Sequence, residues 1–400
     1  MPTCPRITCV LGTRPEVIKM APVIARLRRV GPSLHIEVIT TGQHRGLLDQ
    51  ALADFGVVAT RDLDLMRPDQ GLADLTARAL VALTAEFREY RPDLVLAQGD
   101  TSTVLATALS CYYEKIAFAH VEAGLRTGRA YEPFPEEKHR VLAGHLADLH
   151  FAPTSQARQN LEREGISPSS ILVTGNTVVD ALREVGGRGS SHRIMPEGSR
   201  YLLVTAHRRE NFGAPIDEIC EAVLELVRLD PGLSVVFPVH PNPHVRDAVF
   251  GRLSGSPRII LTEPLGYREF VSLMSGAEAI LTDSGGIQEE GPALGKTVFV
   301  LRDATERPEA IRSGLARLVG PHRGAILSAY REWRSARGRA DVPIANPYGD
   351  GWAAERIARC LAARFQLDLG PWPAGVEAEW DDSPVPGTDQ HLVPVSLSAS

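Results

Sequence analysis

The feature that most constrains the fold of this chain is a repeated alternation of short apolar runs with longer segments of helical periodicity. The first series of apolar runs covers residues 7–11, 36–40, 94–97, 116–121 and 149–152. Short apolar runs bounded by turn residues are typical of buried parallel strands. The alternation therefore predicts a parallel sheet with helices on both faces. Ligands of such sheets bind beyond the carboxyl ends of the strands.

A second series of the same kind follows a break in composition. Residues 185–199 include Gly-Gly-Arg-Gly-Ser-Ser-His, which is typical of a linker. The later apolar runs are residues 201–205, 233–239, 259–262, 279–282 and 298–301. We therefore expect an α/β protein with two domains, each built on a parallel sheet.

The domain boundaries follow from this break and from the composition of the C-terminal part. We place the first domain at residues 1–184 and the second at residues 185–351. A final helix at residues 352–366 is expected to return to the first domain. Residues 367–400 are rich in Pro, Ser, Asp and Gly and lack periodicity, so we expect a mobile tail.

Composition excludes several classes of protein. The chain has 400 residues, 44% of them hydrophobic, which is enough for two cores. A net charge of −6 gives no basic surface for nucleic acid. No run is apolar for long enough to span a membrane, and no signal-peptide pattern precedes residue 16. The five scattered cysteines show neither zinc spacing nor a disulfide framework, so we expect a cytoplasmic protein without a metal.

The stretch Asp283-Ser284-Gly285-Gly286-Ile287-Gln288-Glu289-Glu290 lies between an apolar run and an expected helix at residues 287–294. Unpaired N–H groups at such a turn attract phosphate, and glycines let a pyrophosphate approach closely. Either Glu289 or Glu290 could then accept hydrogen bonds from the two hydroxyls of a ribose. An ordinary helix start, with Ser as N-cap and acids in the first turn, is the alternative.

Polar turns also follow three strands of the first series, at residues 12–19, 98–101 and 120–126. Arg14 and Lys19 could contact phosphate, although a solvated helix face would have the same pattern. The G-x-G-x-x-G spacing is absent, so a bound nicotinamide cofactor is not expected.

Two further groups of polar residues are candidates for chemistry. Pro133 and Pro135 precede Glu136, which could be an oriented carboxylate or simply an acid that pairs with Arg140 four residues later. His207 and His240 end neighbouring predicted strands beside the glycine turn, which favours a functional role over two isolated loop histidines.

Taken in order, seven motifs resemble the non-hydrolysing UDP-N-acetylglucosamine 2-epimerase family. They are residues 12–16 with Lys19, 99–101, 120–126, 135–137, 207–210, 283–290 and 305–309. The resemblance covers roughly residues 6 to 365. It implies a glycosyltransferase-B type fold with two Rossmann-like domains facing a cleft. It also implies no cofactor, a small nucleotide-sugar substrate and a homodimer.

The resemblance also implies roles for individual residues. The residues that match the family's catalytic positions are Asp100, Glu122, Glu136 and His207. Those that match its UDP and sugar contacts are Arg14, Lys19, Arg140, Phe270, Ser284, Gly285, Gly286 and Glu290. A second, regulatory binding region would involve Gln43, Arg209 and His240. His139 departs from the family pattern, since a small or amide residue is expected there.

The implied reaction explains an acid-rich site. The hydrogen on carbon 2 of an N-acetyl sugar lies next to no carbonyl, so loss of UDP from carbon 1 must first make it acidic. Proton-transfer groups and a diphosphate site are then required. A hydrolysing epimerase, a retaining glycosyltransferase and a nucleotide-sugar sensor remain as alternatives, and a product assay separates the three enzymes.

Overall fold

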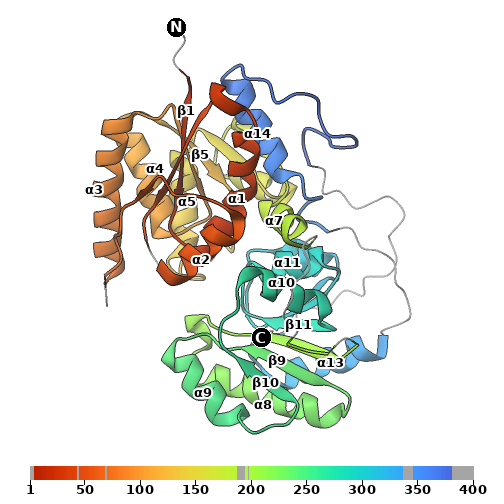
Figure 1. The fold of residues 1–400 in the computed structure, drawn as a ribbon. Coiled ribbons are helices and arrows are strands. Elements are labelled where there is room, and N and C mark those ends of the chain that lie inside the picture. The colour runs from red at the N-terminus through yellow and green to blue at the C-terminus, as the bar shows by residue number, and fades with distance from the viewer. Residues whose placement is uncertain are drawn as a thin grey trace.

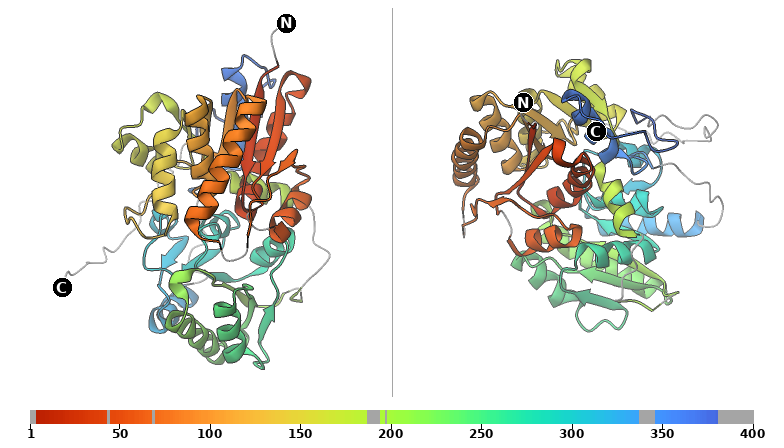
Figure 2. Two further views of the ribbon diagram at one scale, coloured as in Figure 1. Left: turned by 90° about the vertical axis from the view of Figure 1, so that its left-hand side faces the viewer. Right: turned by 45° about the horizontal axis from the view of Figure 1, so that its top comes forward.

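The structure is a computed structural model that describes residues 4–42, 45–67, 70–186, 194–196, 198–336 and 346–380. Its backbone forms two parallel sheets, each flanked by helices. Figure 1 shows the first sheet in the upper half of the molecule and the second in the lower half, with α7 and α11 between them. The left view in Figure 2, turned by 90° about the vertical axis, shows the same division.

The first sheet has seven strands in the order β3-β2-β1-β4-β5-β6-β7. Their bounds are Arg6–Leu11 (β1), His35–Thr40 (β2), Arg61–Asp62 (β3), Leu94–Gln98 (β4), Ala117–Val121 (β5), Leu149–Ala152 (β6) and Ile171–Val173 (β7). The second sheet has six strands in the order β10-β9-β8-β11-β12-β13. Their bounds are Tyr201–Thr205 (β8), Ser234–Pro238 (β9), Ile259–Thr262 (β10), Ala279–Thr282 (β11), Thr297–Val300 (β12) and Ala316–Leu318 (β13).

Helices connect these strands and cover both faces of each sheet. Those that precede the second sheet are α1 (Arg14–Arg28), α2 (Arg45–Phe55), α3 (Leu72–Tyr90), α4 (Ser102–Glu114), α5 (Glu136–Leu146), α6 (Ser155–Arg163) and α7 (Thr177–Gly186). The later ones are α8 (Ala214–Leu229), α9 (Pro243–Leu253), α10 (Tyr267–Gly276), α11 (Ile287–Ala293), α12 (Pro308–Arg312), α13 (Arg323–Ala336) and α14 (Ala353–Arg364).

The predicted α/β class and all ten predicted strands are confirmed. The sequence did not predict β3, β7 and β13, and all three lie at a sheet edge. Their brevity explains this, since β3 has two residues and the other two have three each. Helix α1 begins at Arg14, where Thr13 and Glu16 form a capping box.

Alternate residues of β1 face different cores, as expected for a strand buried on both sides. Cys9 and Leu11 pack with α1 and α14, whereas Val10 packs with α3 and α4. The C-terminal helix α14 thus belongs to the core of the first sheet, and Figure 1 shows it beside α1.

Helix α7 contacts both halves of the protein. Val178, Leu182 and Val185 share a core cluster with Leu203 of β8 and with Ile18 of α1. The proposed boundary between residues 184 and 185 falls inside this helix, and the division into domains remains a proposal.

Residues 367–380 run over the first half of the protein. Arg356 of α14 donates to Glu377 O (2.8 Å), Arg359 donates to Gly370 O (2.8 Å), and Trp380 N donates to Val173 O of β7 (2.9 Å). These contacts count against mobility for this part of the predicted tail, while residues 381–400 lie outside the described ranges. Among the helices that the structure describes, none has the length and apolar character needed to cross a membrane.

A glycine in the loop after β5 shows how tightly the first half is packed. Gly124 has φ +92°, and a Cβ there would lie 2.2 Å from the carbonyl oxygen of Ala157 in α6. Gly165 has a similar φ of +86° but open space around it.

We predict that Gly124→Ala destabilises the protein more than Gly165→Ala. The left-handed conformation alone costs about 1–2 kcal/mol for an L-residue, and the steric overlap at Gly124 adds about 1–3 kcal/mol. Urea unfolding of both variants measures the difference. Equal losses of stability would contradict the close approach of α6 to this loop.

Candidate active site

The carboxyl ends of the central strands in both sheets bring the predicted residues together. Lys19 projects from α1 after β1, Glu122 follows β5, and Glu289 lies in α11 after β11. The turn before α1 is fixed by Gly12, where a Cβ would lie 2.2 Å from Thr103 Oγ1. Glu16 is buried below this turn, and burial raises its pKa to about 7.

Five charged side chains form what we call the buried ion cluster: Lys19, Glu122, Glu289, Glu306 and Arg307. Lys19 Nζ donates to Glu122 Oε2 and lies 3.3 Å from Glu289 Oε2. Arg307 Nε donates to Glu289 Oε1 (2.6 Å), and Arg307 also pairs with Glu306. The exposed fraction of these side chains is between 0% and 7%. The cluster therefore connects the helices and loops of both sheets in a site shielded from water.

The opposite charges of the cluster attract one another, and this attraction offsets the free-energy cost of burying them. Burial alone would lower the pKa of Lys19, but the carboxylates of Glu122 and Glu289 raise it above its usual value. Burial opposes ionisation of Glu306 as well, yet Arg307, Arg140 and Arg302 hold its pKa well below the usual range. Burial raises the pKa of Glu289 to about 7, against the opposing effect of Arg307 and Lys19.

Asp100 and Arg140 form a second ion pair next to this cluster. Arg140 Nη2 donates to Asp100 Oδ2, and its Nη1 lies 3.3 Å from Glu137 Oε2. The sequence offered Arg140 as a partner for Glu136, but the described ion pairs of Arg140 go to Asp100 and Glu137 instead. Glu137 and Arg140 are three residues apart on the buried side of α5, whereas Glu136 lies half-buried beside that face.

Two histidines hold the loop that carries Asp100. His120 donates from Nε2 to Gly99 O (2.7 Å), and burial lowers its pKa to about 4. The ring is therefore neutral at physiological pH. His139, the departure from the family pattern, has Nδ1 3.2 Å from Asp100 O, and burial lowers its pKa too.

The predicted diphosphate turn follows β11. A Cβ on Gly285 would lie 2.7 Å from Arg307 Nη1, so only glycine allows Arg307 to approach this turn. Asp283 is fully buried and accepts hydrogen bonds from the backbone N–H groups of His207 and Arg208. Despite its burial, these bonds and the imidazole of His207, 3.1 Å away, hold the pKa of Asp283 well below its usual value.

The neighbouring acid Glu290 lies on the other side of α11. Its Oε1 accepts a hydrogen bond from Tyr267 OH of α10 (2.9 Å). Burial lowers the pKa of Arg14, and the carboxylate of Glu290 opposes this effect. Phe270 lies half-buried on the same helix as Tyr267.

The expected regulatory residues are only partly described. Gln43 lies outside the described ranges. Arg209 is exposed, and the ring of His240 stacks on that of His207 with 5.7 Å between centroids.

Asn176 was not predicted from the sequence, although its Nδ2 donates to Glu122 Oε2 (2.8 Å). Glu289 and Arg307 were not selected as site residues either. The motif at residues 305–309 was the available signal for Arg307.

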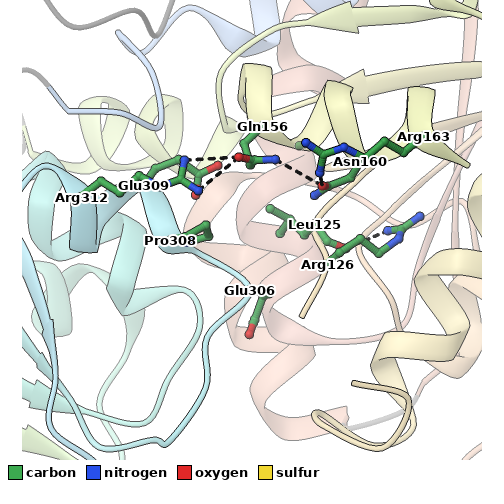
Figure 3. A pocket seen from close by; sticks show the side chains of 10 residues that line it. Leu125, Arg126, Gln156, Asn160, Arg163, Glu306, Pro308, Glu309 and Arg312 are labelled. Carbon is green, nitrogen blue, oxygen red and sulfur yellow. Dashed lines mark hydrogen bonds between the residues drawn. The ribbon is translucent and has the colours of Figure 1, made fainter. Parts of the chain in front are cut away.

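A cavity of about 340 Å³ lies behind the ion cluster (Figure 3). Leu125, Gln156 and Asn160 line it from the first half, and Glu306, Pro308 and Arg312 line it from the second. Both Arg312 Nη atoms lie 3.2 Å from Gln156 Oε1 and join the two sides. In the described part of the chain, no three His, Cys, Asp or Glu side chains group closely enough to hold a metal ion.

The model of the UDP-N-acetylglucosamine 2-epimerase family matches residues 27–362. The protein of that name from Escherichia coli (strain K12) is 45% identical over 369 residues, which cover 89% of this chain and 98% of the relative. The chain belongs to the UDP-N-acetylglucosamine 2-epimerase family.

Solved structures agree with this family. The UDP-GlcNAc 2-epimerase from Neisseria meningitidis bound to UDP-GlcNAc is 42% identical, covers 90% of this chain and 100% of its own, and gives a TM-score of 0.86. The enzyme from Methanocaldococcus jannaschii in complex with UDP-GlcNAc and UDP is 34% identical, covers 90% and 99%, and gives 0.79. The glycosyltransferase-B type fold that the resemblance implied is confirmed.

We predict that Lys19→Met destabilises the protein by about 3–5 kcal/mol at pH 8, because the loss of one partner leaves buried charge uncompensated. The freed carboxylate of Glu289 then has a folded pKa above its unfolded value of about 4.3. As the pH falls from 8 to 5.5, the folded variant therefore binds more protons than the unfolded variant. Its free energy of unfolding rises, and the destabilisation becomes smaller at pH 5.5.

Urea unfolding at pH 5.5 and pH 8 measures both quantities. Lys138→Met, at an exposed position of α5, is the matched control and should change stability by less than about 0.5 kcal/mol at either pH. A pH-independent loss for Lys19→Met would contradict the coupling to buried carboxylates.

Proposed function

We propose that this chain is a non-hydrolysing 2-epimerase that interconverts UDP-N-acetylglucosamine and UDP-N-acetylmannosamine. The observation that carries the proposal is the buried ion cluster, where Glu122 of the first half meets Arg307 and Glu289 of the second. Arg307 also lies against the turn at Gly285. Proton-transfer groups and a diphosphate site are thereby next to each other.

Nucleotide binding would involve mainly the second half of the protein. The turn of Ser284, Gly285 and Gly286 presents backbone N–H groups to a diphosphate, and Arg14 supplies a positive charge from α1. Glu290 would hold the ribose hydroxyls, and Phe270 would lie against the uracil. The solved relatives that contain UDP-GlcNAc or UDP support a nucleotide-sugar substrate.

The reaction would proceed by elimination and re-addition. The bond from carbon 1 to the diphosphate oxygen breaks first, and the positive charge that develops on carbon 1 makes the hydrogen on carbon 2 acidic. A base then removes this proton, and the electron pair of the C–H bond forms a double bond between carbons 1 and 2. The products, 2-acetamidoglucal and UDP, recombine after protonation of carbon 2 from the opposite face. Asp100, Glu122 and Glu136 are the proposed acid–base residues, while His207 would donate to the leaving diphosphate. Lys19 and Arg140 would hold two of the carboxylates.

The burial of the ion cluster supports this proposal over the alternatives. A hydrolysing epimerase must admit water to the glucal intermediate, and side chains with at most 7% exposure leave little room for water there. A sensor would need the nucleotide contacts but not Asp100 and Glu122 together. A glycosyltransferase would need a site for an acceptor. The expected homodimer, cytoplasmic location and regulatory region at Gln43, Arg209 and His240 remain predictions.

We predict that turnover in heavy water places deuterium on carbon 2 of the product without added nicotinamide. The base that takes the old proton exchanges with solvent, and the second protonation uses a solvent-derived proton. Proton NMR of UDP-N-acetylglucosamine incubated with the enzyme measures both epimerisation and exchange. Inversion with full retention of the original hydrogen would exclude the elimination route, and release of free sugar would identify a hydrolysing enzyme.

Variants of the acid–base residues test the intermediate. General acid–base groups contribute roughly 10²–10⁴-fold to rate, so Glu122→Gln and Asp100→Asn should turn over more slowly by a factor in this range. Some 2-acetamidoglucal and UDP should then escape. Glu332→Ala, at an exposed position of α13, is the control and should keep the wild-type rate. Full activity of either acid variant would contradict its role.

We predict separately that Glu290→Ala weakens UDP binding by a factor of about 10 to 100. Each hydrogen bond to a charged acceptor is worth about 1.5–3 kcal/mol. Calorimetric titration with UDP measures the change, again with Glu332→Ala as the control. Wild-type affinity in a folded Glu290→Ala variant would place the ribose contact elsewhere.

A further inference from the structure

The chain passes between the two halves of the protein at two connections, and these cross in direct contact. The first includes residues 174–176 before α7, and the second includes residues 346–351 before α14. Asn176 N donates to Tyr348 O (2.7 Å). Gly175 has φ +81° and Gly349 has φ +131°, and a Cβ on Gly175 would lie 3.1 Å from Gly349 Cα. The two backbones therefore touch, and only glycines allow this.

Arg356 of α14 fixes the crossing from one side. Its guanidinium donates to Thr174 O of the first connection (3.1 Å) and to both carboxylate oxygens of Asp350 in the second (2.8 and 2.7 Å). Arg356 is 2% exposed. A buried arginine with these partners holds both connections in one arrangement.

The crossing reaches the ion cluster through two side chains. Tyr348 is fully buried, and its hydroxyl donates to Arg307 O (3.2 Å) and accepts from Ala310 N (3.1 Å). Asn176 reaches the opposite side of the cluster, where its Nδ2 donates to Glu122 Oε2 (2.8 Å). The same crossing thus contacts Glu122 of the first half and the backbone of Arg307 in the second.

The orientation of the Asn176 amide follows from its other partner. Its Oδ1 accepts a hydrogen bond from Val178 N (3.0 Å), so the group that faces Glu122 must be the NH₂ donor. The residue is 2% exposed. Solvent therefore offers no alternative partner that would let the amide turn.

The two oxygens of Glu122 consequently have different surroundings. Oε2 accepts from both Lys19 and Asn176. Oε1 makes no hydrogen bond with the described residues, and Arg307 Nη2 lies 3.7 Å from it. With Oε2 occupied by two donors, Oε1 is the oxygen able to exchange a proton. Glu122 itself has φ +64°, so its backbone is also held in the left-handed region.

We propose that Asn176 is a positioning residue for this reaction. Its amide occupies Oε2 of Glu122 and thereby directs Oε1 to the sugar. Because Asn176 lies in the crossing of the two connections, the orientation of Glu122 depends on that crossing. The inference rests on the proposed function, in which Glu122 transfers a proton. Asn176 does not touch the substrate and acts through Glu122 alone.

Asn176→Asp is the principal test. The aspartate keeps the Oδ1 acceptor for Val178 N and the size of the side chain, but it replaces the donor with a carboxylate beside Glu122. A like charge at hydrogen-bond distance disfavours ionisation of Glu122. We expect kcat to fall about 10- to 100-fold, KM for UDP-N-acetylglucosamine to stay within about threefold, and the acidic limb of the kcat/KM pH profile to move up by about one pH unit.

Asn160→Asp is the matched control. Asn160 Nδ2 donates to Gly124 O (2.9 Å), two residues after Glu122, but does not touch the carboxylate. The same substitution there should leave the acidic limb in place. A merely structural role for Asn176 would lower the melting temperature or raise KM without moving that limb, and this result would overturn the inference.

Asn176→Ser provides a second test if the aspartate variant does not fold. The shorter hydroxyl cannot span the distance to Glu122, so kcat should again fall at least tenfold with an unchanged Kd for UDP by calorimetry. A kcat within twofold of wild type would overturn the inference. Failure of the proposed function is distinguishable, because the wild-type enzyme itself would then show no exchange at carbon 2 in heavy water.

Discussion

The contact of Lys19 with Glu289 joins the first helix of the chain to the short helix after β11, and the geometry of the site depends on it. Lys19 is buried between two carboxylates that come from different halves of the protein, and Arg307 binds the second carboxylate from behind. None of these charges is stable in a water-free site without the others. The halves must therefore approach closely for the cluster to exist, and they then exclude water from the place where a reactive intermediate would form.

The sequence predicted the fold well because the signals for it are local. A buried parallel strand is an apolar run that ends in a polar turn, and ten such runs are visible. The three missed strands give weaker signals. The runs at β7 and β13 are only three residues long, and Arg61 and Asp62 of β3 are polar, so that the pairing of β3 depends on β2 being already in place. Edge strands take their conformation from a neighbour, which a local pattern does not record.

The site was predicted less completely, because its contacts join residues that are far apart along the chain. Glu289 and Glu290 were equivalent by sequence, but the structure gives them different partners: Glu289 binds Arg307, and Glu290 binds Tyr267. Asn176 follows an ordinary strand and has no motif of chemical interest around it. Its importance comes from Glu122 and Tyr348, which reach it from distant parts of the chain. The contacts of residues 367–380 have the same origin, since Arg356 and Arg359 supply partners that the composition of the segment does not record.

The contact between Gly175 and Gly349 has a mechanical consequence. The backbones of the two connections touch at this point, so a rotation of one half against the other would have its axis near it and would use the contact as a pivot. Displacement grows with distance from an axis. Contacts between the halves that lie far from the pivot would open widely during a rotation that barely moves Glu122, because Asn176 holds this carboxylate close to the pivot. Substrate could enter and product could leave while the proton-transfer group stays almost still, and each closure would return the distant turn at Ser284 to the same position relative to it.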